Sequence, residues 1–276
     1  MTSRRAFLGL LPMTVAATTA TTAATPADAA APARPALPRG NGRSRHDRFI
    51  SPTWRPGSLR LAGRGTALPI VVSSRDHPGV LRVADDLAAD IERVTGVAPP
   101  VVHDRAPRGQ DEVILIGTLG ASPLVDRIAE DGRLDTDRIA GRWETSRQQL
   151  VTSPLPGVKR AFVIAGSDQR GTIFGVYEVS RQMGVSPWYW WDDVPVPHLD
   201  EVYALPGRYT QGTPAVKYRG FFINDENPAL GTWAPGFFGE GHAPGYPEGF
   251  NSAFYAKVFE VMLRLKANYL WPAVWG

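Results

Sequence analysis

The alternation of short apolar runs with amphipathic helical patterns constrains the fold of this chain most. Three runs read as buried strands: LPIVV at 68–72, VILI at 113–116 and FVIA at 162–165. Apolar residues that recur every three or four positions predict one helix over 80–94, ending at Gly96, and another over 171–183. Because strands alternate with helices, we predict an α/β sandwich over residues 58–210.

A second unit is predicted from residue 211 onward. Residues 217–223 read as a strand, 224–249 as a loop rich in glycine and proline, and 254–265 as an amphipathic helix. Asn268 is expected to act as a left-handed C-cap before a further strand in YLWPAVW. This order opens a (β/α)8 TIM barrel, which needs about 250 residues. The sequence therefore predicts only the first strands and helix of an incomplete barrel, truncated at residue 276.

Polar and aromatic side chains follow the two strands of this second unit. Asn224, Asp225 and Glu226 come directly after the first strand, and Trp271 and Trp275 lie in or after the second. In a barrel the active site lies at the carboxyl ends of the strands. Paired carboxylates are the usual equipment for glycoside hydrolysis, but adjacent residues of a strand project to opposite faces. Only one of the two acids can therefore face the pocket, and the second catalytic carboxylate is expected from another strand. The alternative, that these three residues merely cap the strand, stays open.

An aromatic cluster, WYWW at 188–191, precedes two aspartates. Aromatic rings stack on the apolar faces of sugars, so a carbohydrate contact is one interpretation. The other is that these large side chains bury an interface between the two predicted domains, because aromatic residues bury the most area per residue. We favour the interface.

Composition and motifs exclude several function classes. The formal net charge is +3, but the arginines of residues 1–48 account for the excess, which argues against a nucleic-acid partner. The chain has no cysteine, and its five histidines are scattered without a metal-ligand spacing, so neither thiol catalysis nor a metal site is predicted. Since no GxGxxG occurs, no dinucleotide cofactor is expected.

The first residues read as an export signal. Arg4 and Arg5 lie in SRRAFL, which resembles the twin-arginine motif, and the apolar stretch 8–17 is too short to span a bilayer. We therefore expect a signal peptide over 1–30, a disordered linker over 31–57, a secreted or periplasmic protein, and no membrane partner.

Three segments resemble one known family. GTIFGVYEVSRQMGVSPWYWWDDVP (171–195), KYRGFFINDE (217–226) and LRLKANYLWPAVWG (263–276) are similar to glycosyl hydrolase family 115, the xylan α-1,2-glucuronidases. The resemblance implies an N-terminal α/β sandwich like the second domain of β-hexosaminidases, then a catalytic (β/α)8 TIM barrel and further domains. It also implies an inverting hydrolase that removes glucuronic acid or its 4-O-methyl form from glucuronoxylan, without a cofactor and often as a homodimer.

Carried over by motif, Asp225 resembles a catalytic acid of that family, and Trp271 matches a pocket residue in NYLWPA. Asn224, Glu226 and Trp275 are the further substrate-binding candidates. Because the remaining catalytic carboxylates are expected beyond residue 276, we expect this chain to be inactive by itself. Two alternatives stay open: another exo-glycosidase of hexosaminidase-like architecture, and a carbohydrate-binding module without catalysis.

Overall fold

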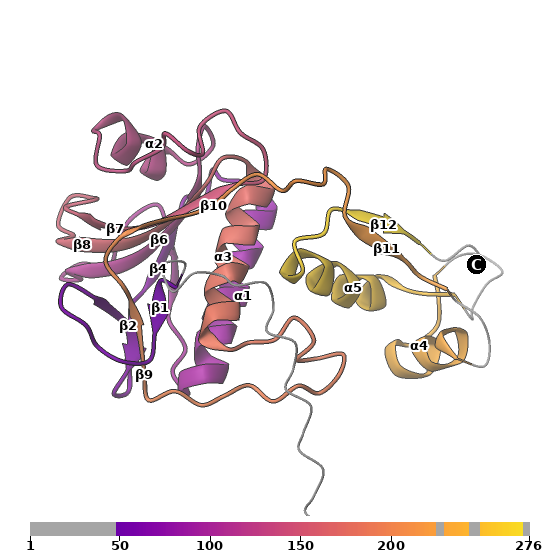
Figure 1. The fold of residues 1–276 in the computed structure, drawn as a ribbon. Helices are drawn as coiled ribbons and strands as arrows, with labels where there is room; N and C mark the ends of the chain where they lie inside the picture. Colours follow the sequence, from indigo (N-terminus) through magenta and orange to yellow (C-terminus); the bar gives the residue numbers. More distant parts are fainter. Residues whose placement is uncertain (1–47, 225–228, 243–248, 273–276) are drawn as a thin grey trace, which may run out of the picture. The chain divides into compact units, whose positions relative to one another are not determined.

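A computed structural model describes residues 48–224, 229–242 and 249–272 of the protein, all within the unit Arg43–Gly276. Figure 1 shows a sheet covered by helices in the first part of this unit and a smaller group of strands and helices after it. In the described part of the chain, no helix combines the length and apolarity needed to cross a membrane.

The central element is a mixed six-stranded sheet with the order β10-β7-β8-β6-β4-β5. Its strands are β4 Ile70–Val72, β5 Val101–His103, β6 Glu112–Thr118, β7 Ser146–Thr152, β8 Arg160–Gly166 and β10 Arg208–Gln211. Strands β5, β4, β6 and β8 run parallel, whereas β7 pairs antiparallel with both β8 and β10. The three strands expected from apolar runs are confirmed as β4, β6 and β8.

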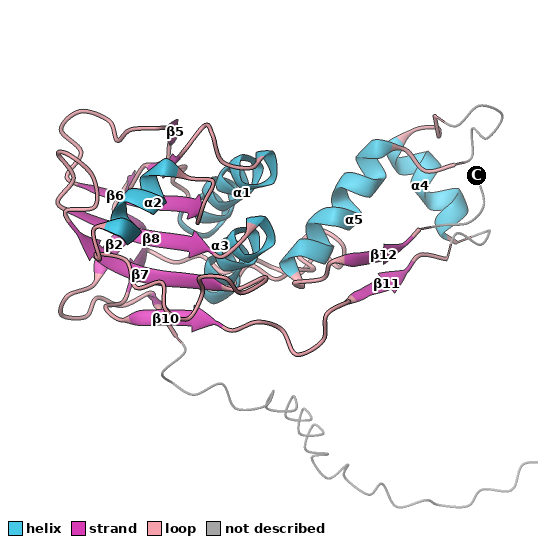
Figure 2. Ribbon diagram, turned by 90° about the horizontal axis from the view of Figure 1, so that it is seen from above, coloured by secondary structure: helices cyan, strands magenta, loops and turns pink. Residues whose placement is uncertain are grey.

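Helices cover both faces of this sheet because successive side chains of each strand point to opposite sides. Ile114 of β6 and its neighbours on the same face pack against α1 Pro78–Thr95 and α3 Gln169–Met183. Leu115, on the other face, packs against α2 Pro123–Glu130. Figures 1 and 2 show α1 and α3 side by side, with α2 apart from them. Both predicted helices are confirmed, and Gly96 is the left-handed C-cap of α1, with φ 75°.

A small antiparallel sheet with the order β1-β9-β2-β3 extends the core of α1 and α3. Its strands are β1 Ile50–Ser51, β2 Leu59–Gly63, β3 Thr66–Ala67 and β9 Glu201–Ala204. The expected linker over 31–57 is therefore wrong at its end. Ile50 pairs with Ala204 and is buried, because its apolar side chain joins the core.

The second part contains the expected strand, helix and strand. These are β11 Gly220–Phe222, α5 Ser252–Arg264 and β12 Tyr269–Trp271, and β11 pairs parallel with β12. A parallel pair joined through a helix is the repeat of a (β/α)8 barrel and also of open α/β sheets. The incomplete barrel therefore stays a prediction.

Two local expectations in this part are wrong. The segment read as a loop contains α4 Leu230–Phe238. Asn268 is not the C-cap of α5, because Lys266 adopts the left-handed conformation, with φ 61°. The Asn268 side chain instead bonds to other segments, as described below. A separate apolar cluster around Ile223, Phe254 and Val258 joins β11, α4 and α5.

Candidate active site

The carboxyl ends of β11 and β12 meet at one edge. The Ile223 amide donates to the Trp271 carbonyl oxygen over 2.9 Å, which continues the pairing one residue beyond β11. Asn224 and Trp271, both predicted as substrate-binding residues, therefore lie on adjacent strands at this edge, and both are exposed. The other three predicted residues, Asp225, Glu226 and Trp275, lie outside the described residues.

An exposed aromatic face lies beside this edge. Phe222 and Trp271 are register partners on one face of the strand pair, with ring centroids 5.6 Å apart, and they are 50% and 58% exposed. Phe221 and Leu270 lie on the opposite face and pack against the cluster around α5. The exposed rings are of the kind on which a sugar ring stacks, and they lie where the sequence predicts substrate binding.

A cavity of about 280 Å³ opens behind this edge, between β11 and α5. The pocket-lining residues are apolar except for one: Trp188, Trp191, Phe221, Phe222, Ile223, Asn224, Leu230, Phe254, Val258 and Val261. Ligand pockets usually measure about 300–1,000 Å³ and combine apolar walls with a few polar groups. Asn224 is the single polar side chain here, so the described lining can orient a ligand but supplies no acid or base.

The aromatic cluster at 188–191 packs against α4 and α5. Trp190 lies 5.7 Å from the ring of Phe237, and Trp191 lies 6.2 Å from that of Phe254, in edge-to-face contacts. The Trp191 indole also donates to the Lys257 carbonyl oxygen over 3.3 Å. Trp190 and Trp191 are half-buried in these contacts, which supports the interface interpretation. Trp188 of the same cluster is 40% exposed, so the carbohydrate contact stays open as the alternative.

A buried ion network connects α5 with α1 and α3. The Arg264 guanidinium donates to both Asp90 carboxylate oxygens, over 2.7 and 3.1 Å, and to Glu260 over 3.0 Å. It also lies over the rings of Tyr177 and Tyr189, 4.6 and 4.9 Å from their centroids. Burial alone would lower the pKa of Arg264, but the hydrogen bonds and the charge of Asp90 raise it above its ordinary value. The cation is therefore permanently charged and fully partnered.

The hydroxyl of Tyr189 extends this network by donating to Glu260 over 2.9 Å. Burial, followed by the charge of Glu260, raises the pKa of Tyr189 to about 12. The tyrosine therefore stays neutral and acts as a hydrogen-bond donor.

A second network fixes the amino ends of β11 and β12. Glu144, whose side chain is fully buried, accepts hydrogen bonds from the Arg219 guanidinium and from Asn268 Nδ2, the latter over 2.8 Å. Arg219 immediately precedes β11, and Asn268 immediately precedes β12. The Asn268 amide oxygen also accepts from the Arg219 backbone N–H over 2.9 Å. One carboxylate of the α/β part thus holds both strands at the edge opposite the candidate site.

The carboxylates with lowered pKa values in these networks hold segments together by ion pairs and are not suited to act as general acids. Burial opposes ionisation of Glu178, but hydrogen bonds and charge from Arg181 and Lys266 lower its pKa to about 2. Burial likewise opposes ionisation of Glu144 and Glu260, yet cationic and hydrogen-bond partners lower both pKa values. A carboxylate held ionised in this way is a poor proton donor at neutral pH. Sequence reasoning missed Glu144 because its partners lie far along the chain, and no local pattern marks such a pair.

Comparisons with known proteins add a family. Residues 211–276 match the model of Glycosyl hydrolase family 115. A solved structure of a family GH115 4-O-methyl-α-glucuronidase with specificity for decorated arabinogalactans is similar, at 29% identity and a TM-score of 0.62. The match covers 78% of this chain and 26% of that one, so the chain spans about a quarter of its length.

More distant structures include two hexosaminidases. A β-hexosaminidase of Streptomyces plicatus has 16% identity and a TM-score of 0.43, with 78% of this chain and 31% of that chain covered. A GH20 β-N-acetylhexosaminidase of Streptomyces coelicolor A3(2) has 15% identity and a TM-score of 0.42, with the same coverage. No curated protein matches the chain.

Proposed function

Because this chain belongs to glycosyl hydrolase family 115, we propose that it is part of an α-glucuronidase that releases glucuronic acid or its 4-O-methyl form from a polysaccharide. The observation that carries the proposal is the family match over residues 211–276, which includes the INDE motif and both strands of the candidate edge. The similar 4-O-methyl-α-glucuronidase supports the reaction class. Glucuronoxylan is the substrate we favour, and a decorated arabinogalactan is the competing one.

The proposed mechanism is inverting hydrolysis by two carboxyl groups. One protonates the leaving oxygen and the other activates water, across a separation of about 6.5–9.5 Å. Asp225 is the proposed carboxylate of this chain, while Asn224 and Trp271 position the sugar ring. The described part of the edge offers no second carboxyl group, so residues beyond the described ones would complete the pair. Because the match covers only 26% of the similar 4-O-methyl-α-glucuronidase, we also propose that residues 1–276 alone do not turn over substrate.

The test is substitution of Asp225 in the protein that carries the whole catalytic domain. Asp225→Asn should lower the release of 4-O-methyl-glucuronate by about 10²–10⁴-fold, the range for loss of a general acid or base. Asp85→Asn removes an exposed carboxylate of the α/β part and serves as the matched control. Glucuronoxylan, arabinogalactan and a β-N-acetylhexosaminide are assayed in parallel. Undiminished release by the Asp225 variant, or turnover of the hexosaminide alone, would refute the proposal.

We also propose export through the twin-arginine leader. Residues 1–57 fused to a reporter should direct it out of the cytoplasm, and replacing Arg4 and Arg5 together with lysine should abolish this transfer. Cytoplasmic retention of the unmodified fusion would contradict the proposal.

A further inference from the structure

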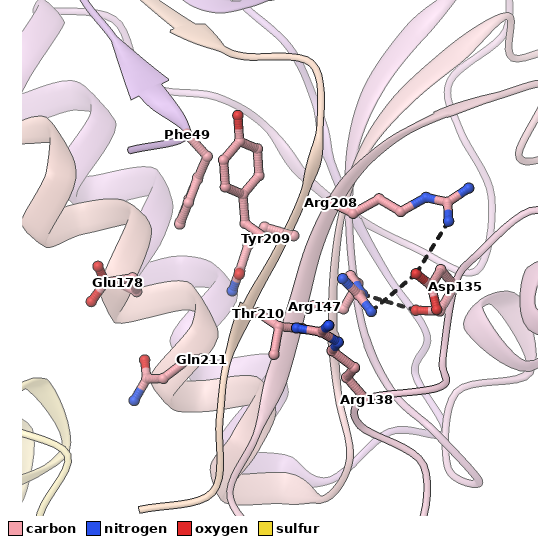
Figure 3. Close-up of a pocket in the computed structure, with 10 residues that line it drawn as sticks. Phe49, Asp135, Arg138, Arg147, Glu178, Arg208, Tyr209, Thr210 and Gln211 are labelled. Atoms are coloured by element: carbon pink, nitrogen blue, oxygen red, sulfur yellow. Dashed lines mark hydrogen bonds and ion pairs between the residues drawn. The ribbon is translucent and has the colours of Figure 1, made fainter. Parts of the chain in front are cut away.

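A second cavity, of about 590 Å³, lies along β10 in the α/β part. It shares no lining residue with the cavity beside β11, and its volume is typical of ligand pockets. Its walls are mainly polar, and Figure 3 shows them on both sides of β10. Arg208 and Thr210 point to one side of this edge strand, and Tyr209 and Gln211 point to the other, as strand alternation requires.

Three guanidinium groups gather on one side of β10. Arg208 comes from β10, Arg147 comes from β7 directly opposite Thr210, and Arg138 comes from the connection before β7. They surround Asp135 (Figure 3). Arg147 Nε donates to the Asp135 carbonyl oxygen over 2.9 Å, and Arg208 Nη1 lies 3.3 Å from Asp135 Oδ2. Arg138 has no ion-pair partner within the described ranges. A single carboxylate therefore faces three cations.

The positive charge of this cluster is incompletely neutralised. Arg147 is only 2% exposed, and its Nη2 lies 3.2 Å from Asp135 Oδ2 without the geometry of a hydrogen bond. Burial lowers the pKa of Arg147, Asp135 opposes this, and the charges of Arg208 and Arg138 lower it further. The exposed Asp137 adds only a weaker compensating charge.

The other acid in the lining does not supply the missing charge. Glu178 lies across β10 from the three arginines and is already paired with Arg181 and Lys266. The buried Thr210 hydroxyl also lacks a hydrogen-bond partner among the described residues. A buried cation that its neighbours repel, beneath two exposed cations, attracts an anion.

We propose that this cavity is an anion site that binds the carboxylate of a uronic-acid sugar, and so holds an acidic polysaccharide on the α/β part away from the catalytic edge. The exposed Arg138 and Arg208 contact the carboxylate directly, since paired guanidinium groups match its geometry. Arg147 supports the site from below through its charge. The choice of a uronic acid rests on the proposed function, whereas the attraction for an anion rests only on the cluster.

The experiment is a titration of the 276-residue chain with D-glucuronate, D-glucose and sulfate, followed by amide NMR shifts of β10 and β7. Glucuronate should bind and shift residues 208–211, and glucose, which lacks the carboxylate, should not. Arg208→Gln should weaken glucuronate binding by about tenfold, and adding Arg138→Gln should weaken it further, as expected for lost charged hydrogen bonds. Asp135→Asn should strengthen binding, because it removes the competing carboxylate.

Arg64→Gln is the matched control. Arg64 is as exposed as Arg208 and is also paired with one carboxylate, Glu201, but it does not line this cavity. Its loss should leave binding unchanged, and circular dichroism checks that every variant is folded. Glucuronate binding that is absent, or that ignores Arg208 and Arg138, would overturn the anion site. Sulfate binding as tight as glucuronate binding would overturn the sugar assignment.

Failure of this inference is distinguishable from failure of the proposed function. If Arg208-dependent glucuronate binding persists while the whole enzyme releases no uronic acid, the anion site is supported and the proposed function is refuted. If the whole enzyme releases uronic acid normally but the chain binds no glucuronate along β10, the proposed function is supported and the anion site is refuted.

Discussion

The guanidinium of Arg264 shows how one residue fastens α5 to the α/β part. It is buried between Asp90 and Glu260 and between two tyrosine rings. Arg264→Met should lower the free energy of unfolding by about 3–5 kcal/mol, because it leaves the Asp90 charge buried with reduced compensation. Urea unfolding followed by fluorescence measures the loss.

Two further variants separate the cost of leaving Asp90 unpaired from the net contribution of the Arg264–Asp90 ion pair to stability. Adding Asp90→Leu to Arg264→Met should restore much of the stability, since replacing both ions of a buried pair by apolar residues is often nearly neutral. Arg82→Gln removes an exposed i,i+4 partner of Asp86 on the same helix as Asp90 and should cost about 0.5 kcal/mol or less. An Arg264 variant as stable as the Arg82 variant would contradict the role of the network.

Glu178 should make stability depend on acid pH. Its pKa of about 2 in the folded protein lies below the ordinary value of 4.5. Its ion pairs therefore stabilise the fold fully above pH 4.5, and this contribution is lost as the pH falls towards about 2. Glu178→Gln removes the contribution, so the stability difference between wild type and variant should be largest near neutral pH and should shrink in acid. Urea unfolding at about pH 6 and about pH 3 tests this, and a difference that grows in acid would show the opposite sign.

At the scale of elements, the close pairing of β11 with β12 depends on Gly220. A Cβ at this position would lie 1.6 Å from the Tyr269 carbonyl oxygen, so Gly220→Ala must push the strands apart. We expect a loss of about 1–3 kcal/mol, as for other overpacked sites. The hydrogen exchange of the Ile223 amide, which bonds to Trp271 across the pair, should accelerate.

The control for Gly220 lies in the neighbouring helix. Gly236 is an exposed residue of α4, and a Cβ there meets nothing within 4 Å. Gly236→Ala should therefore stabilise the chain, by up to about 1 kcal/mol, because alanine favours the helix. Equal effects of the two substitutions in thermal unfolding would show that the strand contact does not decide the outcome.

Elements with an apolar period could be predicted from the sequence, whereas elements held by polar contacts could not. The apolar runs of β4, β6 and β8 were sufficient to predict these three strands. Strand β7, SRQQLVT, was missed although its first four residues are buried, because its side chains make polar contacts instead of apolar packing. Gln148, Gln149 and the Nε atom of Arg147 form hydrogen bonds. Helix α4 was missed because its glycines and Pro235 resemble a loop.

The same limit applies to the candidate site. The edge formed by Asn224 and Trp271 follows from parallel pairing, which the order strand, helix, strand predicts. The anchors of that edge do not follow from any local pattern. Asn268 seemed suited to a C-cap, but its amide bonds to Glu144 and Arg219 across long stretches of sequence. Such contacts exist only once the chain has folded.

At the scale of the whole molecule, stability is unevenly distributed. The six-stranded sheet has extensive apolar clusters on both faces, whereas the strand pair that carries the candidate site rests on the small cluster around Ile223, Phe254 and Val258. A two-stranded pair is marginal by itself in water. The α/β part therefore stabilises the candidate site through two networks. Glu144 holds the amino ends of β11 and β12, and Asp90 holds Arg264 at the carboxyl end of α5.

Native-state hydrogen exchange can test this dependence. Amides of β11 and Ile223 should exchange at a lower free energy than those of β6 and β8, since local opening follows local packing. Glu144→Gln should lower the opening free energy of Ile223 by about 1.5–3 kcal/mol, the range for hydrogen bonds to a charged group, and should leave β6 unchanged. Glu112→Gln, which removes a half-exposed partner of Arg160 at the start of β6, is the matched carboxylate control. If the Glu144 variant loosens β6 and Ile223 equally, the two parts unfold as one and the anchoring role assigned to Glu144 is wrong.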